Sequence, residues 1–73
     1  MRMTGEQFDV LVKLMRGSPT SKANRAARRV LTEGILQVEA AQQFDLSAPS
    51  VSAAVKRYTL ADKLIRGAYL DQV

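Results

Sequence analysis

The sequence contains no cysteine and no histidine. The absence of cysteine excludes disulfides and thiolate metal sites, and the absence of histidine excludes imidazole acid/base catalysis and the triads built on it. No run of about 18 apolar residues is present to span a membrane, and residues 1–4 do not begin a signal peptide. These absences predict a cytoplasmic protein that is not an enzyme and that binds no metal, cofactor, membrane or small-molecule substrate.

Aromatic residues are also scarce, at 5% of the 73 residues, but the 47% of apolar and 25% of charged residues are typical of a soluble globular protein. A domain this short buries only about 60% of the surface that its unfolded chain exposes, so natural examples often add a disulfide, a metal or a partner subunit. Because the chain has no cysteine, a partner subunit is the remaining means of added stability. We expect a single domain over residues 1–73 that pairs with another subunit.

Positive charge is unevenly distributed along the chain. Eleven lysines and arginines oppose seven acidic residues, and the resulting formal charge of +4 is typical of proteins that bind a polyanion. No acidic residue lies between Asp9 and Glu33, so the sequence alone leaves the cations of this interval uncompensated. They are Lys13, Arg16, Lys22, Arg25, Arg28 and Arg29. A spacing of three and four residues puts several of them on one helical face, for which a merely solvated surface is the alternative explanation.

Apolar residues recur at helical spacing, and no strand pattern competes with them. Thr4 and Gln7 form a capping box before the first helix, Thr20 or Ser21 caps the second, and Gly34 ends it. We therefore expect an all-α fold, a small bundle of four to five helices. The expected helices cover residues 4–16, 20–33, 37–44, 48–58 and 59–73.

The last of these boundaries stays open at the level of sequence. Thr59 and Asp62 offer a second capping box, which would begin a separate helix over residues 59–73. Five apolar residues nevertheless make one unbroken stripe across this point, as a single long helix would require. They are Ala54, Tyr58, Ala61, Ile65 and Ala68.

Residues 37–58 have the size pattern of a helix-turn-helix. Such a unit needs small residues where its two helices cross, larger ones beneath and within the turn, and an apolar inner side on the second helix. The residues that meet these needs are Ala41, Phe44, Leu46, Val51, Ala54 and Val55. Asp45 stands in the turn where glycine is common, but aspartate tolerates a left-handed backbone. A helical hairpin packed on a third helix without any DNA-binding role is the alternative.

In this interpretation the second helix presents small side chains to the bases of DNA in the major groove. The predicted base-reading residues are Ala48, Pro49, Ser50, Ser52 and Ala53. Positive and polar side chains around them are expected to contact the phosphate backbone. These predicted backbone contacts are Lys22, Arg25, Arg28, Arg29, Gln37, Ser47, Lys56 and Arg57. No asparagine or glutamine is available in the reading segment for a bidentate contact to adenine.

The sequence resembles the TrfB/KorA family of plasmid-encoded transcriptional repressors. The residues that carry the resemblance are Thr4, Gln7, Phe8, Ala27, Arg28, Val30, Leu31, Gly34, Gln37, Ala41, Leu46, Val51, Ser52, Ala54, Val55 and Arg57. The resemblance implies an all-helical bacterial DNA-binding domain that forms a dimer, binds a palindromic operator in double-stranded DNA and represses transcription. This implies a location at the nucleoid.

Two departures limit what the resemblance transfers. Well-known members have a glutamine where Ala53 stands here, and they continue into a separate C-terminal dimerisation region. We therefore expect the segment from Thr59 onward to supply a homodimer contact, with the two reading helices about 34 Å apart, one turn of duplex. The predicted dimer residues are Leu60, Leu64, Ile65, Ala68 and Tyr69.

Two other functions fit parts of the pattern. A nonspecific, nucleoid-type DNA-binding protein would explain why the reading segment lacks long polar side chains. A small protein-interaction module or antirepressor would use the apolar C-terminal segment, although such a module has no need of the six cations between Asp9 and Glu33.

Overall fold

A computed structural model describes residues 3–70 of the chain, except for the side chain of Leu70. Within that range the protein contains helices and no strand, which confirms the expected all-α class. The elements in chain order are α1 (Gly5–Leu14), α2 (Lys22–Glu33), α3 (Gln37–Gln43), α4 (Ala48–Ile65) and the π-helical segment η1 (Arg66–Leu70).

The ends of the first two helices lie close to where the sequence predicts them. The backbone N–H of Thr4 donates to Gln7 Oε1 at 2.9 Å, and the N–H of Gln7 donates to Thr4 Oγ1 at 3.1 Å, so the capping box is present. Ser21 caps α2 by accepting from the N–H of Asn24 at 3.1 Å. Gly34 ends α2 with a φ of 76°, a left-handed conformation that glycine adopts without steric cost. The first helix stops at Leu14, two residues earlier than expected.

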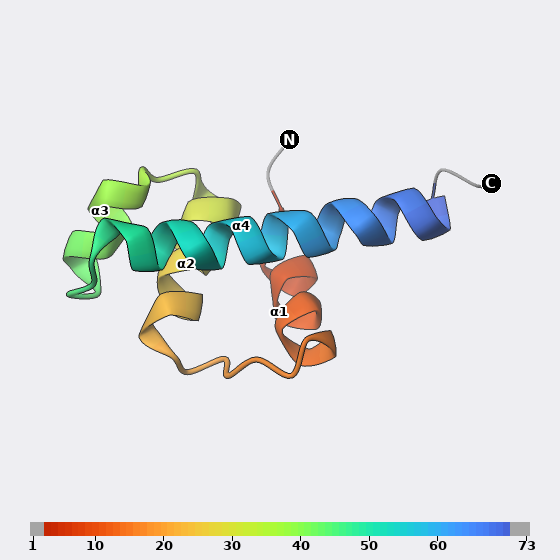
Figure 1. Ribbon diagram of the computed structural model, residues 1–73, viewed down its shortest axis with the longest axis horizontal. Helices are drawn as coiled ribbons and strands as arrows, with labels where there is room; N and C mark the ends of the chain where they lie inside the picture. The colour runs from red at the N-terminus through yellow and green to blue at the C-terminus, as the bar shows by residue number, and fades with distance from the viewer. Residues whose placement is uncertain (1–2, 71–73) are drawn as a thin grey trace.

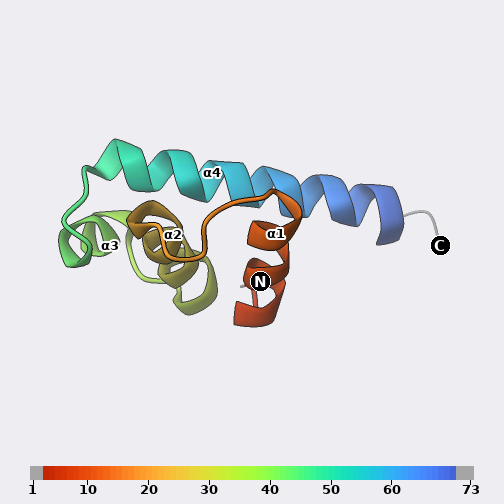
Figure 2. The ribbon, with the colours of Figure 1, turned by 90° about the horizontal axis from the view of Figure 1, so that it is seen from below.

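Helix α4 runs along the longest dimension of the molecule, and α1, α2 and α3 lie together on one side of it (Figure 1, Figure 2). The Cα atoms span 42 × 24 × 19 Å. Helix α2 packs against both α3 and α4, whereas α1 contacts α2 and α4. The C-terminal end of α4 extends beyond α1, with no other helix beside it in either view.

The core lies between α4 and the three shorter helices. Its two large aromatic residues, Phe8 of α1 and Tyr58 of α4, are 2% and 0% exposed, and their ring centroids are 4.8 Å apart. Phe44, in contrast, is only half-buried at its rim. The buried apolar residues are Met3, Phe8, Leu11, Val12, Ala26, Ala27, Ala40, Ala41, Val51, Ala54, Val55 and Tyr58. Because five of these twelve are alanines, the core is small in volume.

Of the two alternatives that the sequence leaves open at Thr59, the structure shows the single long helix, because α4 continues through Thr59 to Ile65 before η1 follows. Asp62 caps no helix, and its carboxylate instead accepts from Arg66 Nε at 2.9 Å. The helix stays continuous because one apolar stripe packs against α1 and α2 on both sides of Thr59. This stripe consists of the buried Tyr58 and the half-buried Ala61 and Ile65. Residues 71–73 of the predicted segment lie outside the described part of the chain.

A short turn over residues 44–47 joins α3 to α4. Asp45 has a φ of 55°, the left-handed conformation that the sequence predicts there. The N–H of Leu46 donates to the carbonyl of Ala41 at 2.8 Å, which closes the turn against α3. Ser47 then caps α4, because its hydroxyl accepts from the N–H of Ser50 at 3.4 Å.

Candidate nucleic-acid interface

The N-terminal half of α4 has one buried side and one open side. Val51, Ala54 and Val55 are at most 8% exposed and hold this half of the helix against the core. The predicted base-reading residues Ala48, Pro49, Ser50 and Ala53 are exposed, and Ser52 is half-buried. The open side of the helix therefore presents small side chains, which leave room for close approach to a groove or a flat surface.

The hydroxyls at the start of α4 are partly used by the helix itself. Ser47 Oγ and Ser50 Oγ lie 2.8 Å apart and share a hydrogen bond, and Ser47 Oγ also accepts from the backbone of Ser50. Each hydroxyl keeps further hydrogen-bonding capacity, since a serine hydroxyl has one donor and two acceptor sites. Ser47 and Ser50 can thus contact a ligand while they cap the helix.

Lys56 and Arg57 follow on the next turn of α4, and both side chains are exposed. Neither belongs to an ion pair within residues 3–70. Their charges are therefore available to a polyanion that lies along the open side of the helix.

Arg25 of α2 lies beside the turn that leads into α4. Its guanidinium carbon is 5.2 Å from the centroid of the Phe44 ring, a cation–π contact that ties α2 to the end of α3. Arg25 remains exposed, as does Lys22 one turn earlier, and neither has an ion pair among the residues described. The structure thus places Arg25 beside Phe44, the first residue of the turn that leads into α4.

The positive charge of Arg29 is compensated by an acidic residue, so the expectation from the sequence that this cation is uncompensated is wrong. Its guanidinium donates to both carboxylate oxygens of Glu33, at 2.9 and 3.1 Å, and also to Gln43 Oε1 of α3. The hydrogen bond to Glu33 raises the pKa of Arg29, and the same bond lowers the pKa of Glu33. Arg29 therefore lies beside α3 with its charge largely matched.

Arg28 is also paired, and it faces a different neighbour. It donates from Nε to Asp9 Oδ1 at 3.0 Å, and this hydrogen bond raises the pKa of the guanidinium. Because Asp9 belongs to α1, the structure directs Arg28 toward α1, whereas Arg25 and Arg29 contact the end of α3. Gln37, the remaining predicted contact, is half-buried as the first residue of α3.

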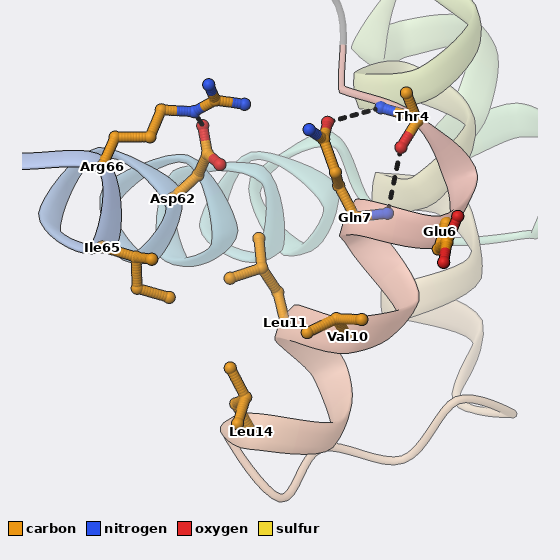
Figure 3. Close-up of a pocket in the computed structure, with 9 residues that line it drawn as sticks. All are labelled: Thr4, Glu6, Gln7, Val10, Leu11, Leu14, Asp62, Ile65 and Arg66. Atoms are coloured by element: carbon orange, nitrogen blue, oxygen red, sulfur yellow. Dashed lines mark hydrogen bonds and ion pairs between the residues drawn. The ribbon is translucent and has the colours of Figure 1, made fainter. Parts of the chain in front are cut away.

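The predicted dimer residues lie in α4 and η1, beyond the part of α4 that α2 and α3 cover. Leu60, Leu64 and Tyr69 are 57%, 63% and 73% exposed, and Ala68 is exposed as well. Ile65 differs, because it is half-buried and points toward α1 (Figure 3).

A groove of about 460 Å³ lies between α1 and the C-terminal part of α4 (Figure 3). Leu11 and Leu14 of α1 and Ile65 of α4 point into the space between the two helices. The residues that line it are Thr4, Glu6, Gln7, Val10, Leu11, Leu14, Asp62, Ile65 and Arg66. The contribution of α1 was not predicted from the sequence, although the spacing of four between Val10 and Leu14 indicates a second apolar row on that helix.

Two kinds of site are absent from the described residues. No three acidic side chains gather to form a metal site, and none of the helices is both long and apolar enough to cross a bilayer.

Comparisons with protein-family models, with curated proteins and with solved structures find no match to this chain. The resemblance to the TrfB/KorA family therefore remains a prediction from the residues that carry it.

Proposed function

We propose that the protein is a sequence-specific DNA-binding transcriptional regulator, a dimeric repressor of a palindromic operator. In this proposal α3, the turn over residues 44–47 and α4 act as a helix-turn-helix, and the N-terminal half of α4 enters the major groove. One observation carries the proposal: the first two turns of α4 are held firmly by Val51 and Val55 while their open side bears only small side chains.

The dimensions of DNA explain why this arrangement suits the major groove. A groove about 12 Å wide admits a helix, and small side chains let the helix backbone approach the base edges. Ser50 and Ser52 offer hydroxyls to those edges, and Ala48 and Ala53 offer methyl groups that suit the thymine methyl.

Phosphate contacts would come from both sides of the reading segment. Lys56 and Arg57 lie at its far end, and Arg25 of α2 contacts Phe44 at the start of the preceding turn. Lys22 is exposed and precedes Arg25 by about one turn of α2. If about six phosphates are neutralised, the logarithm of the binding constant falls with the logarithm of salt concentration with a slope of about −5. The similarity to TrfB/KorA repressors supports the same assignment and adds a plasmid-encoded, nucleoid-associated role to the proposal.

The decisive experiment is selection from random duplex DNA at about 150 mM salt, a physiological ionic strength. Enrichment of a palindromic motif is the expected result. Retention of DNA without an enriched motif would instead indicate a nonspecific DNA-binding protein, and no retention would leave the protein-interaction module. Either result would overturn the proposal.

Two variants then test the assigned reading segment. Ala53→Gln introduces a side chain that can pair with adenine, so the selected motif should change at one position of each half-site. Arg57→Ala should weaken binding to all sequences alike and leave the motif unchanged. A variant of Ala53 that selects the wild-type motif with unchanged affinity would exclude this face of α4 as the reading surface.

A further inference from the structure

Exposed large apolar side chains gather at one end of the molecule. Five of the eight in the described chain belong to α1 or to the helix from residue 60 onward. We call these five residues the apolar end: Val10, Leu14, Leu60, Leu64 and Tyr69. They are 49–73% exposed. Val10 and Leu14 belong to α1, whereas the other three belong to the end of α4 and to η1, which extend past α1 (Figure 1). Clusters of this kind on a small soluble domain mark an interaction surface.

The groove between α1 and α4 lies within the same end. Leu11 and Leu14 of α1 and Ile65 of α4 point into the space between the two helices (Figure 3), and Val10 of α1 also lines the groove. The projecting helix and the groove are thus adjacent parts of one surface. A projection next to a groove is self-complementary under two-fold symmetry, because each copy can fill the groove of the other.

Charge at this end favours a second copy over DNA as the occupant. Two acidic residues, Glu6 and Asp62, balance two basic residues, Lys63 and Arg66, and one pair of them is already joined at 2.9 Å. The remaining Glu6 and Lys63 have no ion pair within the described residues, so two copies can offer each other opposite charges. Four further unpaired cations, Lys22, Arg25, Lys56 and Arg57, lie outside this end. Lys13 of α1 is unpaired as well, but it lines a separate pocket with Asp9 and Pro19 and not the groove.

We infer that a second copy of the chain docks the C-terminal part of its α4 into the groove between α1 and α4, with the two α4 helices antiparallel. The interface is therefore composite, since α1 contributes Val10 and Leu14 beside Leu64 and Ile65 of α4. A second copy also supplies what the small, alanine-rich core lacks, namely further burial of large apolar side chains.

In this arrangement the length of α4 sets the distance between the dimer contact and the reading segment. This consequence rests on the proposed function. The helix is continuous from Ala48 to Ile65. At 1.5 Å per residue, the centre of the reading segment lies about 22 Å from Ile65 along the axis. Two antiparallel helices that cross at about 20–50° would then separate their reading segments by about 40–43 Å. One turn of DNA is about 34–36 Å, so this separation exceeds the spacing of consecutive major grooves by less than the width of one helix, about 10 Å.

Sedimentation equilibrium without DNA tests the docking, with three matched variants. Leu14→Glu places a charge in the groove wall of α1, and Leu64→Glu places one on the projecting helix. Leu36→Glu is the control, because Leu36 is 67% exposed, like Leu14 at 65% and Leu64 at 63%, but precedes α3 at the other end. The wild type and the control should sediment as dimers at about 100 µM, while both other variants shift to the 8.0 kDa monomer with at least about a tenfold rise in the dissociation constant.

Helical circular dichroism of each variant shows that it is folded, which exposed substitutions should allow. A monomeric wild type would overturn the inference. A dimer that dissociates with Leu64→Glu but persists with Leu14→Glu would overturn the composite groove, because α1 would then lie outside the interface.

The distance that α4 sets between the two reading segments is tested separately, on duplexes that carry two copies of the selected half-site. Affinity should peak at a spacing of about 10–12 base pairs between half-site centres and fall when half a turn is inserted. Equal affinity at all spacings would show that α4 does not fix the distance between the two reading segments. A protein that forms the composite dimer but binds no DNA would refute the proposed function and leave the docking intact.

Discussion

The part of α4 up to Tyr58 and the stretch from Thr59 through η1 have opposite surroundings. In the first part Val51 and Tyr58 are fully buried, and the outward side chains are small or charged. In the following stretch Leu64 of α4 and Tyr69 of η1 are 63% and 73% exposed, although apolar residues recur there at helical spacing. The comparison teaches that an apolar stripe shows which face of a helix can be buried. The packing of the other helices determines along which part of its length that face is buried.

The largest expected effect compares two tyrosines of this region. Tyr58→Ala removes a ring that packs on Phe8 and should lower the free energy of unfolding by about 3–5 kcal/mol. Tyr69→Ala, the same change in the exposed η1, should lower it by less than about 0.5 kcal/mol in the monomer. Urea titrations at a protein concentration too low for dimers measure both values. Equal losses would show that the two tyrosines are alike in burial.

The next effect compares two arginines of α2. Arg25→Ala should weaken binding to every DNA sequence by about tenfold and make the salt slope shallower by about one unit, because Arg25 has no ion pair within residues 3–70. Arg28→Ala should leave the slope unchanged, because Asp9 already matches its charge. Fluorescence anisotropy across a salt series gives both slopes, and a larger change for Arg28 would reverse the assignment.

A smaller effect concerns the hydroxyl of Tyr58, which is buried and has no hydrogen-bond partner among the described residues. Tyr58→Phe keeps the ring and removes the unsatisfied group, so the free energy of unfolding should rise by about 1 kcal/mol. Thermal unfolding followed by circular dichroism measures the change. A loss of stability would mean that the hydroxyl has a hydrogen-bonding partner in solution.

The smallest effect concerns the acidic partner of Arg29. Glu33→Gln removes the charge that Arg29 matches, so DNA affinity should rise about threefold and the salt slope should steepen by up to one unit. Glu6→Gln, at the other end of the molecule, is the control and should leave both unchanged. Unaltered binding in the Glu33 variant would place Arg29 away from the DNA.

The same pair has a pH dependence. Because the hydrogen bond to Arg29 lowers the pKa of Glu33 from its ordinary 4.5, its contribution to stability is complete above pH 4.5 and is lost as the pH falls through the lowered value. Unfolding measured between pH 6 and pH 3 should show this loss in the wild type. The Glu33→Gln variant should lack this component of the pH dependence.

Local interactions explain why much of the fold could be predicted. The cap at Thr4, the left-handed residues Gly34 and Asp45, and the cap at Ser21 each depend on neighbours within a few positions, which the sequence displays directly. The pairing of Arg29 with Glu33 also follows from a local spacing of four residues, although Arg29 was predicted to be uncompensated.

Long-range contacts explain what could not be predicted. Arg28 pairs with Asp9 across nineteen positions, and only the packing of α1 on α2 brings the two together. The capping box at Thr59 was equally plausible in the sequence, but burial of Tyr58 and Ile65 along one stripe outweighs it and keeps α4 continuous.

The sequence by itself determined the helical class, most helix ends and the basic character of the chain, because these depend on composition and on residues close together in the chain. The tertiary structure decided which cations stay unpaired, that residues 48–53 and the exposed Leu60 and Leu64 lie on one continuous helix, and that α1 forms a groove beside the C-terminal part of that helix. Those features depend on where separate helices pack against one another, and apolar periodicity alone does not specify which faces meet.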